Sequence, residues 1–260
     1  MAAAQTATSQ EVSEALRLPE LMAIMRDEGV DYGKDLAGEL FPDGNDSRWL
    51  DMVAAIYGAP TVRTHFDDVF AQQLEGAPQD VPAILAFFTG DLGKRIVGLE
   101  IDARRTMLDP AAEEAARLSW SSLEDKDRGR LRDLRRFAEV NNLVEENVAG
   151  TMNANLAFYH GLNDGGAFAG DRMDEDDILA EVRGQEPQVR RETEDWLMPY
   201  LALAYQPLSD AELGDYIAFS ESHAGQTLNA ALFAAYGAIY PEISNELGRA
   251  AARILAGQDI

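Results

Sequence analysis

Three histidines, His65, His160 and His223, are the chain's clearest candidates for acid–base chemistry. A His-Glu-x-x-His or Glu-x-x-His pattern would indicate a metal site on a helix, and neither occurs. The chain also has no cysteine, which excludes thiol catalysis, disulfides and thiolate metal ligands. His223 stands two residues after Glu221, and this pair is either a general base beside a carboxylate or an exposed histidine at a helix cap. The sequence predicts no metal and no cofactor.

A second group of polar residues interrupts the apolar stripe of a predicted long helix. Asn141, Asn142 and Glu145 fall within that stripe, and Arg104 would reach them if two halves of the chain pack together. A polar cluster inside a helical bundle either binds a ligand or fixes the register of the helices. The candidate ligand-binding residues are therefore His223, Glu221, Asn141, Asn142, Glu145 and Arg104.

The segment "DRGRLRDLRRF" places Arg128, Arg132, Arg135 and Arg136 on one helical face. Acidic residues are interleaved with these arginines, so the segment is either a solvated, salt-bridged face or a docking patch for an acidic partner. The net charge of −24 repels polyanions, and nucleic acid is not an expected partner.

Helical periodicity dominates the chain, and an all-α fold is the prediction. We expect a first helix over Glu11–Glu28 that stops at Gly29, and a long spine helix over Glu124–His160. A Gly/Asp-rich loop should occupy residues 163–173. Pro187 and Pro207 should bracket one segment, and Ser209 with Glu212, three residues later, forms a capping box at a helix start.

Two stretches, Ala86–Ile96 and Ala218–Leu228, resemble each other at an offset of 132 positions. Each has Ala-Phe, five residues and then Gly93 or Gly225, which predicts a tight elbow between two helices. Upstream, apolar positions match at an offset of 122. We expect a disordered stub over 1–9 and two tandem helical repeats, 10–120 and 124–256, packed as one helical bundle with a hairpin at the C-terminal end.

The C-terminal half resembles the family called domain of unknown function 2059, and the N-terminal half resembles it weakly. The residues that carry this resemblance are Ser209, Glu212, Leu213, Phe219, Ala224, Gly225 and Leu228. The chain departs from the family pattern near His223, where a proline is usual. The resemblance implies an all-helical, exported bacterial protein and implies no enzyme activity.

These observations favour a non-catalytic, exported, helical protein that binds a partner protein or small ligand between its repeats. One alternative is a hydrolase using His223 and nearby carboxylates, although nucleophile motifs such as Gly-x-Ser-x-Gly are absent. Another is a carrier of an apolar molecule lined by phenylalanines such as Phe87, Phe88, Phe219 and Phe233. The start of the chain resembles either the remnant of a cleaved signal peptide or an ordinary disordered terminus. With the family resemblance, a periplasmic or other exported location is expected, and the cytoplasm is the alternative. We expect a monomer or a homodimer without a membrane-spanning segment.

Overall fold

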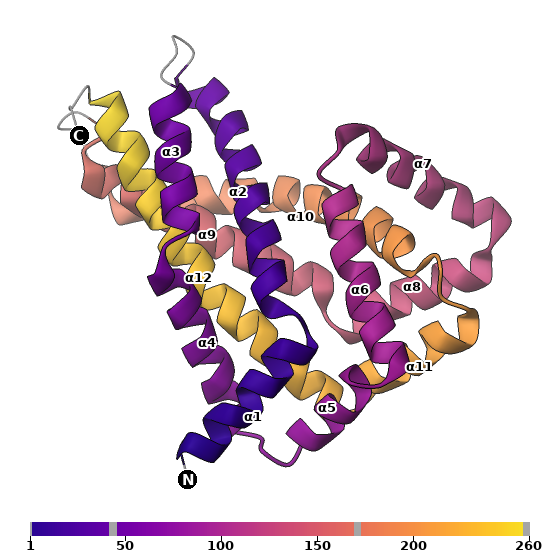
Figure 1. Cartoon of the computed structure of the whole chain (residues 1–260). Coiled ribbons are helices and arrows are strands. Elements are labelled where there is room, and N and C mark those ends of the chain that lie inside the picture. The colour runs from indigo at the N-terminus through magenta and orange to yellow at the C-terminus, as the bar shows by residue number, and fades with distance from the viewer. Residues whose placement is uncertain (1, 42–45, 169–172, 257–260) are drawn as a thin grey trace. The chain divides into compact units, whose positions relative to one another are not determined.

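The computed structural model describes residues 2–41, 46–168 and 173–256, and Figure 1 shows that this part of the chain is built from helices without strands. The predicted all-α class is confirmed. No helix within these ranges is both long enough and apolar enough to cross a membrane. The helices are α1 (Ala2–Ala15), α2 (Leu18–Leu40), α3 (Asp46–Tyr57), α4 (Pro60–Glu75), α5 (Val81–Phe88), α6 (Asp91–Thr106), α7 (Pro110–Lys126), α8 (Arg128–Val140), α9 (Leu143–Gly165), α10 (Glu175–Tyr205), α11 (Asp210–Glu221) and α12 (His223–Leu255).

The chain divides into two compact units. Unit 1 contains Met1–Leu21, Asp68–Asn147 and Arg190–Ala234. Unit 2 contains Met22–Asp67, Val148–Val189 and Ala235–Ile260. Each unit therefore takes segments from both halves of the sequence, and each is described separately below.

Several predicted helix boundaries are wrong. Gly29 does not end a helix but lies inside α2. Its missing side chain makes room for the ring of Tyr57, since a Cβ there would lie 2.3 Å from Cζ of that ring. The predicted spine helix is broken twice, since Asp127 caps the start of α8 and Asn142 adopts a left-handed backbone with φ 51°. The predicted boundary at Pro187 is absent, because α10 continues through that residue.

The N-terminal stretch and the predicted loop also differ from the expectation. Helix α1 covers residues 2–15 and so includes most of the expected stub. Helix α9 continues to Gly165, so the predicted loop begins three residues later than expected. Residues 169–172 of that loop lie outside the described residues.

The two predicted elbows, both in unit 1, have the same backbone. At the α5–α6 elbow, Gly90 has φ −72° and ψ 167°, and its N–H donates to the Phe87 carbonyl over 3.1 Å. At the α11–α12 elbow, Ser222 has φ −69° and ψ 159°, and its N–H donates to the Phe219 carbonyl over 3.0 Å. Thr89 and Gly90 separate the helices at the first elbow and Ser222 alone separates them at the second, and the residue just before the second helix is extended in both.

Glycine three residues after each of these positions permits the close contact across the elbow, as predicted. A Cβ on Gly93 would lie 2.2 Å from the Phe87 carbonyl oxygen, and a Cβ on Gly225 would lie 2.1 Å from that of Phe219. These separations are far below van der Waals contact, so any larger residue would force the following helix away from the preceding one.

The elbows bring aromatic rings together in the core of unit 1. The rings of Phe87 and Phe219 are stacked, with centroids 4.1 Å apart. Phe88 and Tyr216 pack against this pair, and Phe137 from α8 contacts Tyr216 at 4.9 Å. Because the rings contact one another directly, this cluster does not favour the carrier alternative.

Unit 2 has a core of its own. Trp49 of α3 is fully buried and donates from Nε1 to the Gly33 carbonyl of α2 over 2.6 Å. Glycine also permits close helix contact between α9 and α12, since a Cβ on Gly161 would lie 2.1 Å from the carbonyl oxygen of Asn245. His65 pairs with Glu242 in this unit at 3.0 Å.

We predict that Gly225→Ala destabilises the protein by about 1–3 kcal/mol, as overpacking does, because the added methyl would overlap a backbone carbonyl that cannot rotate away. Gly214→Ala is the matched control. Gly214 lies on α11, where nothing would lie within 4 Å of an added Cβ, and the change should stabilise by up to about 1 kcal/mol. Urea unfolding measures both free energies, and equal effects would contradict the role assigned to Gly225.

Candidate functional site

A cleft of about 610 Å³ lies wholly within unit 1. It is formed by side chains of α7, α8, the start of α9 and α10, and we call it the unit 1 cleft. Its volume falls in the range of about 300–1,000 Å³ that is usual for ligand sites. The residues that line it are Arg117, Trp120, Ser121, Arg135, Ala138, Glu139, Asn142, Val144, Glu145, Glu194, Asp195, Met198 and Pro199.

Apolar groups line one part of the cleft. Trp120 of α7 is partly exposed, and Val144 and Met198 are partly exposed beside it in the lining. The guanidinium of Arg135 lies 5.9 Å from the centre of the Trp120 indole, within the range of a cation–π interaction. The cleft thus offers an aromatic ring, a thioether and an aliphatic side chain to a bound group.

Acidic groups outnumber basic ones in the lining. The four carboxylates of Glu139, Glu145, Glu194 and Asp195 are exposed, whereas the lining contains only two guanidinium groups. The cleft therefore presents an excess of negative charge to solvent.

Two of the charged groups have partners along the edge of the cleft. Arg117 donates to Glu113 over 2.6 Å, and this bond, with a smaller contribution from the charge of Asp195, raises the pKa of Arg117. Arg190 donates to both carboxylate oxygens of Glu145 and lowers the pKa of that carboxyl. These pairs hold the long side chains at the rim in fixed positions.

The α8–α9 turn positions one side of the cleft. Asn142 adopts a left-handed backbone there, a conformation that asparagine tolerates better than most residues. Its N–H donates to the Glu139 carbonyl over 3.0 Å, which closes the turn and carries Glu145 into the lining. The cleft therefore brings together three of the residues predicted from the sequence: Arg135, Asn142 and Glu145.

Asn141 is buried and serves the backbone. Its Nδ2 donates to the Phe137 carbonyl over 2.9 Å, and its own carbonyl accepts from Asn229 over 3.0 Å. Arg104 lies over the ring of Trp196 at 6.0 Å. Neither residue lines the unit 1 cleft.

His223 lies at the α11–α12 elbow, outside the cleft. Its Nδ1 is 2.7 Å from a carboxylate oxygen of Asp80, and the same oxygen accepts from the Thr227 hydroxyl over 2.7 Å. The Asp80 side chain is 10% exposed and that of His223 is 77% exposed. Glu221 does not join this group, because it pairs with Arg136 at 2.6 Å. The geometry resembles a base oriented by a carboxylate, but His223 projects into solvent.

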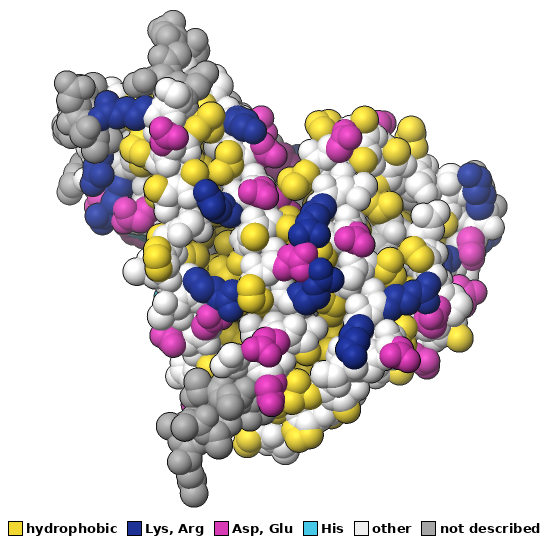
Figure 2. All heavy atoms as spheres, in the orientation of Figure 1, with side chains coloured by type: hydrophobic (Ala, Val, Ile, Leu, Met, Phe, Trp, Pro, Cys, Tyr) yellow, Lys and Arg dark blue, Asp and Glu magenta, His cyan; other side chains and the backbone are white. Residues whose placement is uncertain are grey.

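The arginines of α8 have separate surroundings. Arg132 lies 3.8 Å from Asp133, Arg136 contacts Glu221, and Arg135 lies over Trp120 in the cleft. Arg128 is exposed. Figure 2 shows basic and acidic side chains intermingled over the face in view, as on an ordinary solvated surface.

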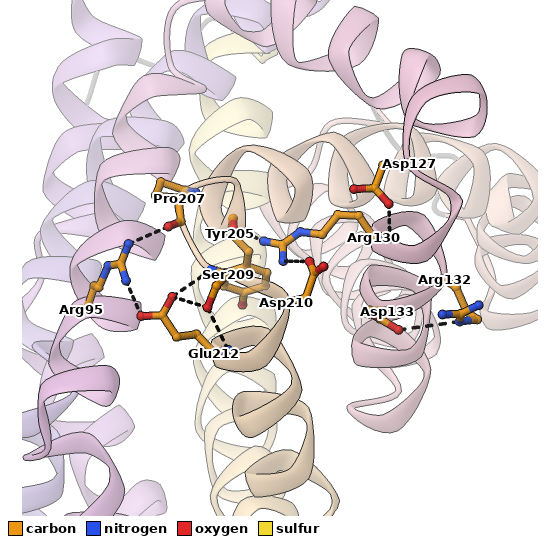
Figure 3. A network of polar contacts seen from close by, with 10 residues as sticks. All are labelled: Arg95, Asp127, Arg130, Arg132, Asp133, Tyr205, Pro207, Ser209, Asp210 and Glu212. Carbon is orange, nitrogen blue, oxygen red and sulfur yellow. Dashed lines mark hydrogen bonds and ion pairs between the residues drawn. The ribbon is translucent and has the colours of Figure 1, made fainter.

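Arg130, in the same segment, has a structural role that the sequence analysis did not identify. Arg130 is buried and donates to the Tyr205 carbonyl, the last residue of α10, and to Asp210 at the start of α11 (Figure 3). Arg95 of α6 donates to the Pro207 carbonyl over 2.6 Å and to Glu212. Arg130 precedes the buried Leu134 by four residues, and because residues four apart share one face of a helix, this spacing indicates that Arg130 faces the core.

The turn between α10 and α11 is thus held from two sides. The predicted capping box at its end is confirmed: the Ser209 N–H donates to the Glu212 carboxylate over 2.8 Å, and the Glu212 N–H donates to the Ser209 hydroxyl over 3.3 Å. This capping, led by the backbone bond from Ser209, lowers the pKa of Glu212.

A carboxyl group that the sequence did not single out lies among the aromatic rings of unit 1. Glu100 of α6 accepts at Oε1 from the hydroxyls of Tyr205 over 2.7 Å and Tyr216 over 3.0 Å. Desolvation raises the pKa of Glu100, although the two phenolic bonds act against that shift. Burial, with the charge of Glu100 as a further cause, raises the pKa of both tyrosines.

We predict that Arg130→Ala destabilises the protein by about 1–3 kcal/mol, because it removes a buried, charged donor from the Tyr205 carbonyl, which then keeps only the N–H of Leu208. Arg132→Ala is the matched control on the same helix. The Arg132 side chain is 77% exposed, against 10% for Arg130, and its loss should change stability by less than about 0.5 kcal/mol. Thermal and urea unfolding of the two variants compare them directly.

We predict that Glu100→Gln becomes relatively more stabilising as pH rises. The folded-state pKa of Glu100 is raised above the ordinary value of 4.5, so the folded protein holds this proton more tightly than the unfolded chain. Wild-type stability from this group is therefore lost as pH rises from about 4.5 through the folded pKa, and glutamine removes that loss.

Glu212→Gln is the control with the opposite sign. Its folded-state pKa is lowered, so Glu212 contributes stability above the unfolded pKa that is lost as pH falls through the folded pKa. Unfolding free energies, each relative to wild type, should change with pH above about pH 4.5 for Glu100→Gln and below about pH 4.5 for Glu212→Gln. The Glu100→Gln variant should become relatively more stable as pH rises, and the Glu212→Gln variant as pH falls. Parallel slopes would show that Glu100 is not desolvated.

Within the described residues, no group of three or more His, Asp or Glu side chains is arranged to hold a metal ion. Comparison of the chain with protein-family models, with curated proteins and with solved structures gives no match. The geometry of the unit 1 cleft is therefore the basis for assigning a function.

Proposed function

We propose that this protein is a non-catalytic binding protein whose unit 1 cleft holds part of a partner protein or a small ligand. The observation that carries the proposal is the cleft of about 610 Å³, whose lining combines exposed charged groups with a partly exposed tryptophan. Tryptophan and arginine are the residue types most enriched where binding energy concentrates at interfaces, and Trp120 and Arg135 lie together here.

The hydrolase alternative has less support. His223 has a carboxylate partner in Asp80, but its side chain is 77% exposed, and the cleft does not include it. A general base needs a substrate held within hydrogen-bonding reach in a site that limits water. The surroundings of His223 suit a contact with Asp80 that joins α12 to the start of α5 better than they suit catalysis.

The two-repeat architecture is part of this proposal and has three supports within unit 1. The elbows share one backbone conformation 132 positions apart. Two contacts relate the elbow segments reciprocally at the same offset: Arg95 with Glu212, and Thr227 with Asp80. Such an exchange is what an approximate twofold axis between two copies produces.

The third support is the pair of left-handed turns. Arg17, between α1 and α2, has φ 53°, and Asn142, between α8 and α9, has φ 51°. The Arg17 N–H donates to the Glu14 carbonyl over 3.0 Å, as Asn142 does to Glu139. These turns lie 125 positions apart, so the repeat register in this region is better placed at 125 than at the 122 inferred from apolar residues.

We further propose that the chain belongs with the exported helical proteins that its C-terminal half resembles. The capping box of Ser209 and Glu212 and the close contact of Gly225 with Phe219 give physical roles to residues that carry the resemblance. Export to the periplasm, and a monomeric or homodimeric state, are the expectations that follow.

Site-specific photo-crosslinking tests the binding function. A photoreactive phenylalanine analogue at Ser121, an exposed residue in the lining, should crosslink the partner in the cells that make this protein. The same analogue at Tyr32, an exposed position in unit 2, is the control. We expect the Ser121 product to disappear when Trp120→Ala is added. Equal labelling at both positions, or labelling that survives Trp120→Ala, would contradict the proposal.

A further inference from the structure

We infer that the occupant of the unit 1 cleft is a basic, partly apolar segment of a partner protein. This inference rests on the proposed binding function and specifies the chemistry of the partner. It follows from the balance of charges in the lining, from the groups that already engage the two arginines, and from the apolar surface between the charges.

The charge of the cleft selects a cation. Glu139, Glu194 and Asp195 are exposed carboxylates from two helices, α8 and α10, whereas Glu145 is already paired with Arg190. A lysine or arginine side chain entering between α8 and α10 would meet carboxylates from both helices. The net charge of −24 would also attract a basic segment over distances of about a Debye length, roughly 8–10 Å at ordinary salt.

The two arginines of the lining do not cancel this preference. Arg117 is bonded to Glu113, and the guanidinium of Arg135 lies over the ring of Trp120. An acidic occupant would have to compete for both groups while facing the carboxylates of Glu139, Glu194 and Asp195. This arrangement also disfavours the acidic partner considered for the α8 arginines, because Arg135 is directed to the cleft and Arg136 to Glu221.

The apolar groups account for the second part of the inference. Trp120, Val144 and Met198 add aromatic and aliphatic surface to the lining of the cleft. Methionine adapts its shape to varied apolar groups, and tryptophan receives both apolar groups and cations. An apolar side chain neighbouring a basic one in the partner would occupy this surface.

A protein segment fits these observations better than a small molecule does. Small-molecule sites are lined predominantly by apolar and aromatic side chains, whereas six of the thirteen residues here are charged. Polar rims around a small apolar centre are typical of protein–protein interfaces.

Fluorescence anisotropy with three labelled synthetic peptides of equal length tests the inference on the full-length protein. One peptide contains lysine and leucine, one contains glutamate and leucine, and one contains lysine and serine. We expect the lysine–leucine peptide to bind most tightly and to weaken as salt is raised. Trp120→Ala should weaken its binding, and circular dichroism and thermal unfolding should show that this variant remains folded.

A matched pair of double variants identifies the carboxylates that are responsible. Glu194→Gln with Asp195→Asn should weaken binding of the lysine–leucine peptide roughly three- to tenfold, as loss of two exposed ion pairs does. Asp35→Asn with Glu246→Gln makes the same change in net charge at exposed positions of unit 2 and should change binding less than about twofold.

The outcomes separate the two proposals. If the glutamate–leucine peptide binds as tightly as the lysine–leucine peptide, or if both double variants weaken binding equally, the basic occupant is wrong. Loss of Ser121 crosslinking with Trp120→Ala would then still support the cleft as a binding site. If Trp120→Ala leaves both crosslinking and peptide binding unchanged, the cleft is not the site and both proposals fail.

Discussion

The contact of a glycine with a backbone carbonyl across each elbow is the constraint on which unit 1 depends. Gly93 and Gly225 let α6 and α12 begin directly against the helices that precede them. This close start sets where the rings of Phe87 and Phe219 lie, and their stacking joins the two elbows. The positions of the neighbouring aromatic rings, and of the carboxyl of Glu100 among them, follow from that arrangement.

Backbone polar groups at helix ends, which need partners outside the helix, are a second constraint on unit 1. In the α10–α11 turn the Tyr205 carbonyl accepts from the Leu208 N–H, and Arg130 and Arg95 add side-chain donors to the carbonyls of Tyr205 and Pro207. Figure 3 shows that these side chains come from α8 and α6, on different sides of the turn. The same helix α8 carries Arg135 and Glu139 into the cleft, so the interaction that fixes the turn also orients one wall of the candidate site.

The sequence was informative where the physical cause was local. The capping box at Ser209 and the elbow at Gly225 depend on residues within a few positions, and both were predicted. Gly29 was misread as a helix stop, because its role is to admit the ring of Tyr57 from another helix, which periodicity does not reveal. Asn141 and Asn142 are of a residue type that tolerates a left-handed backbone, but only the structure shows that Asn142 adopts it and breaks the helix. The cleft was found only in part for the same reason: Trp120 and Asp195 are distant in sequence, and neither interrupts a pattern.

The shared hydrogen bonds of Glu100 have a consequence for the tolerance of this protein to alkali. Tyr205 and Tyr216 donate to one carboxylate oxygen, and both lie in the aromatic core. Ionising either phenol would remove a donor and place a second negative charge beside the first. While α6, α10 and α11 remain packed, the pKa of both hydroxyls is raised, and separation of these helices would let the two phenols ionise at lower pH.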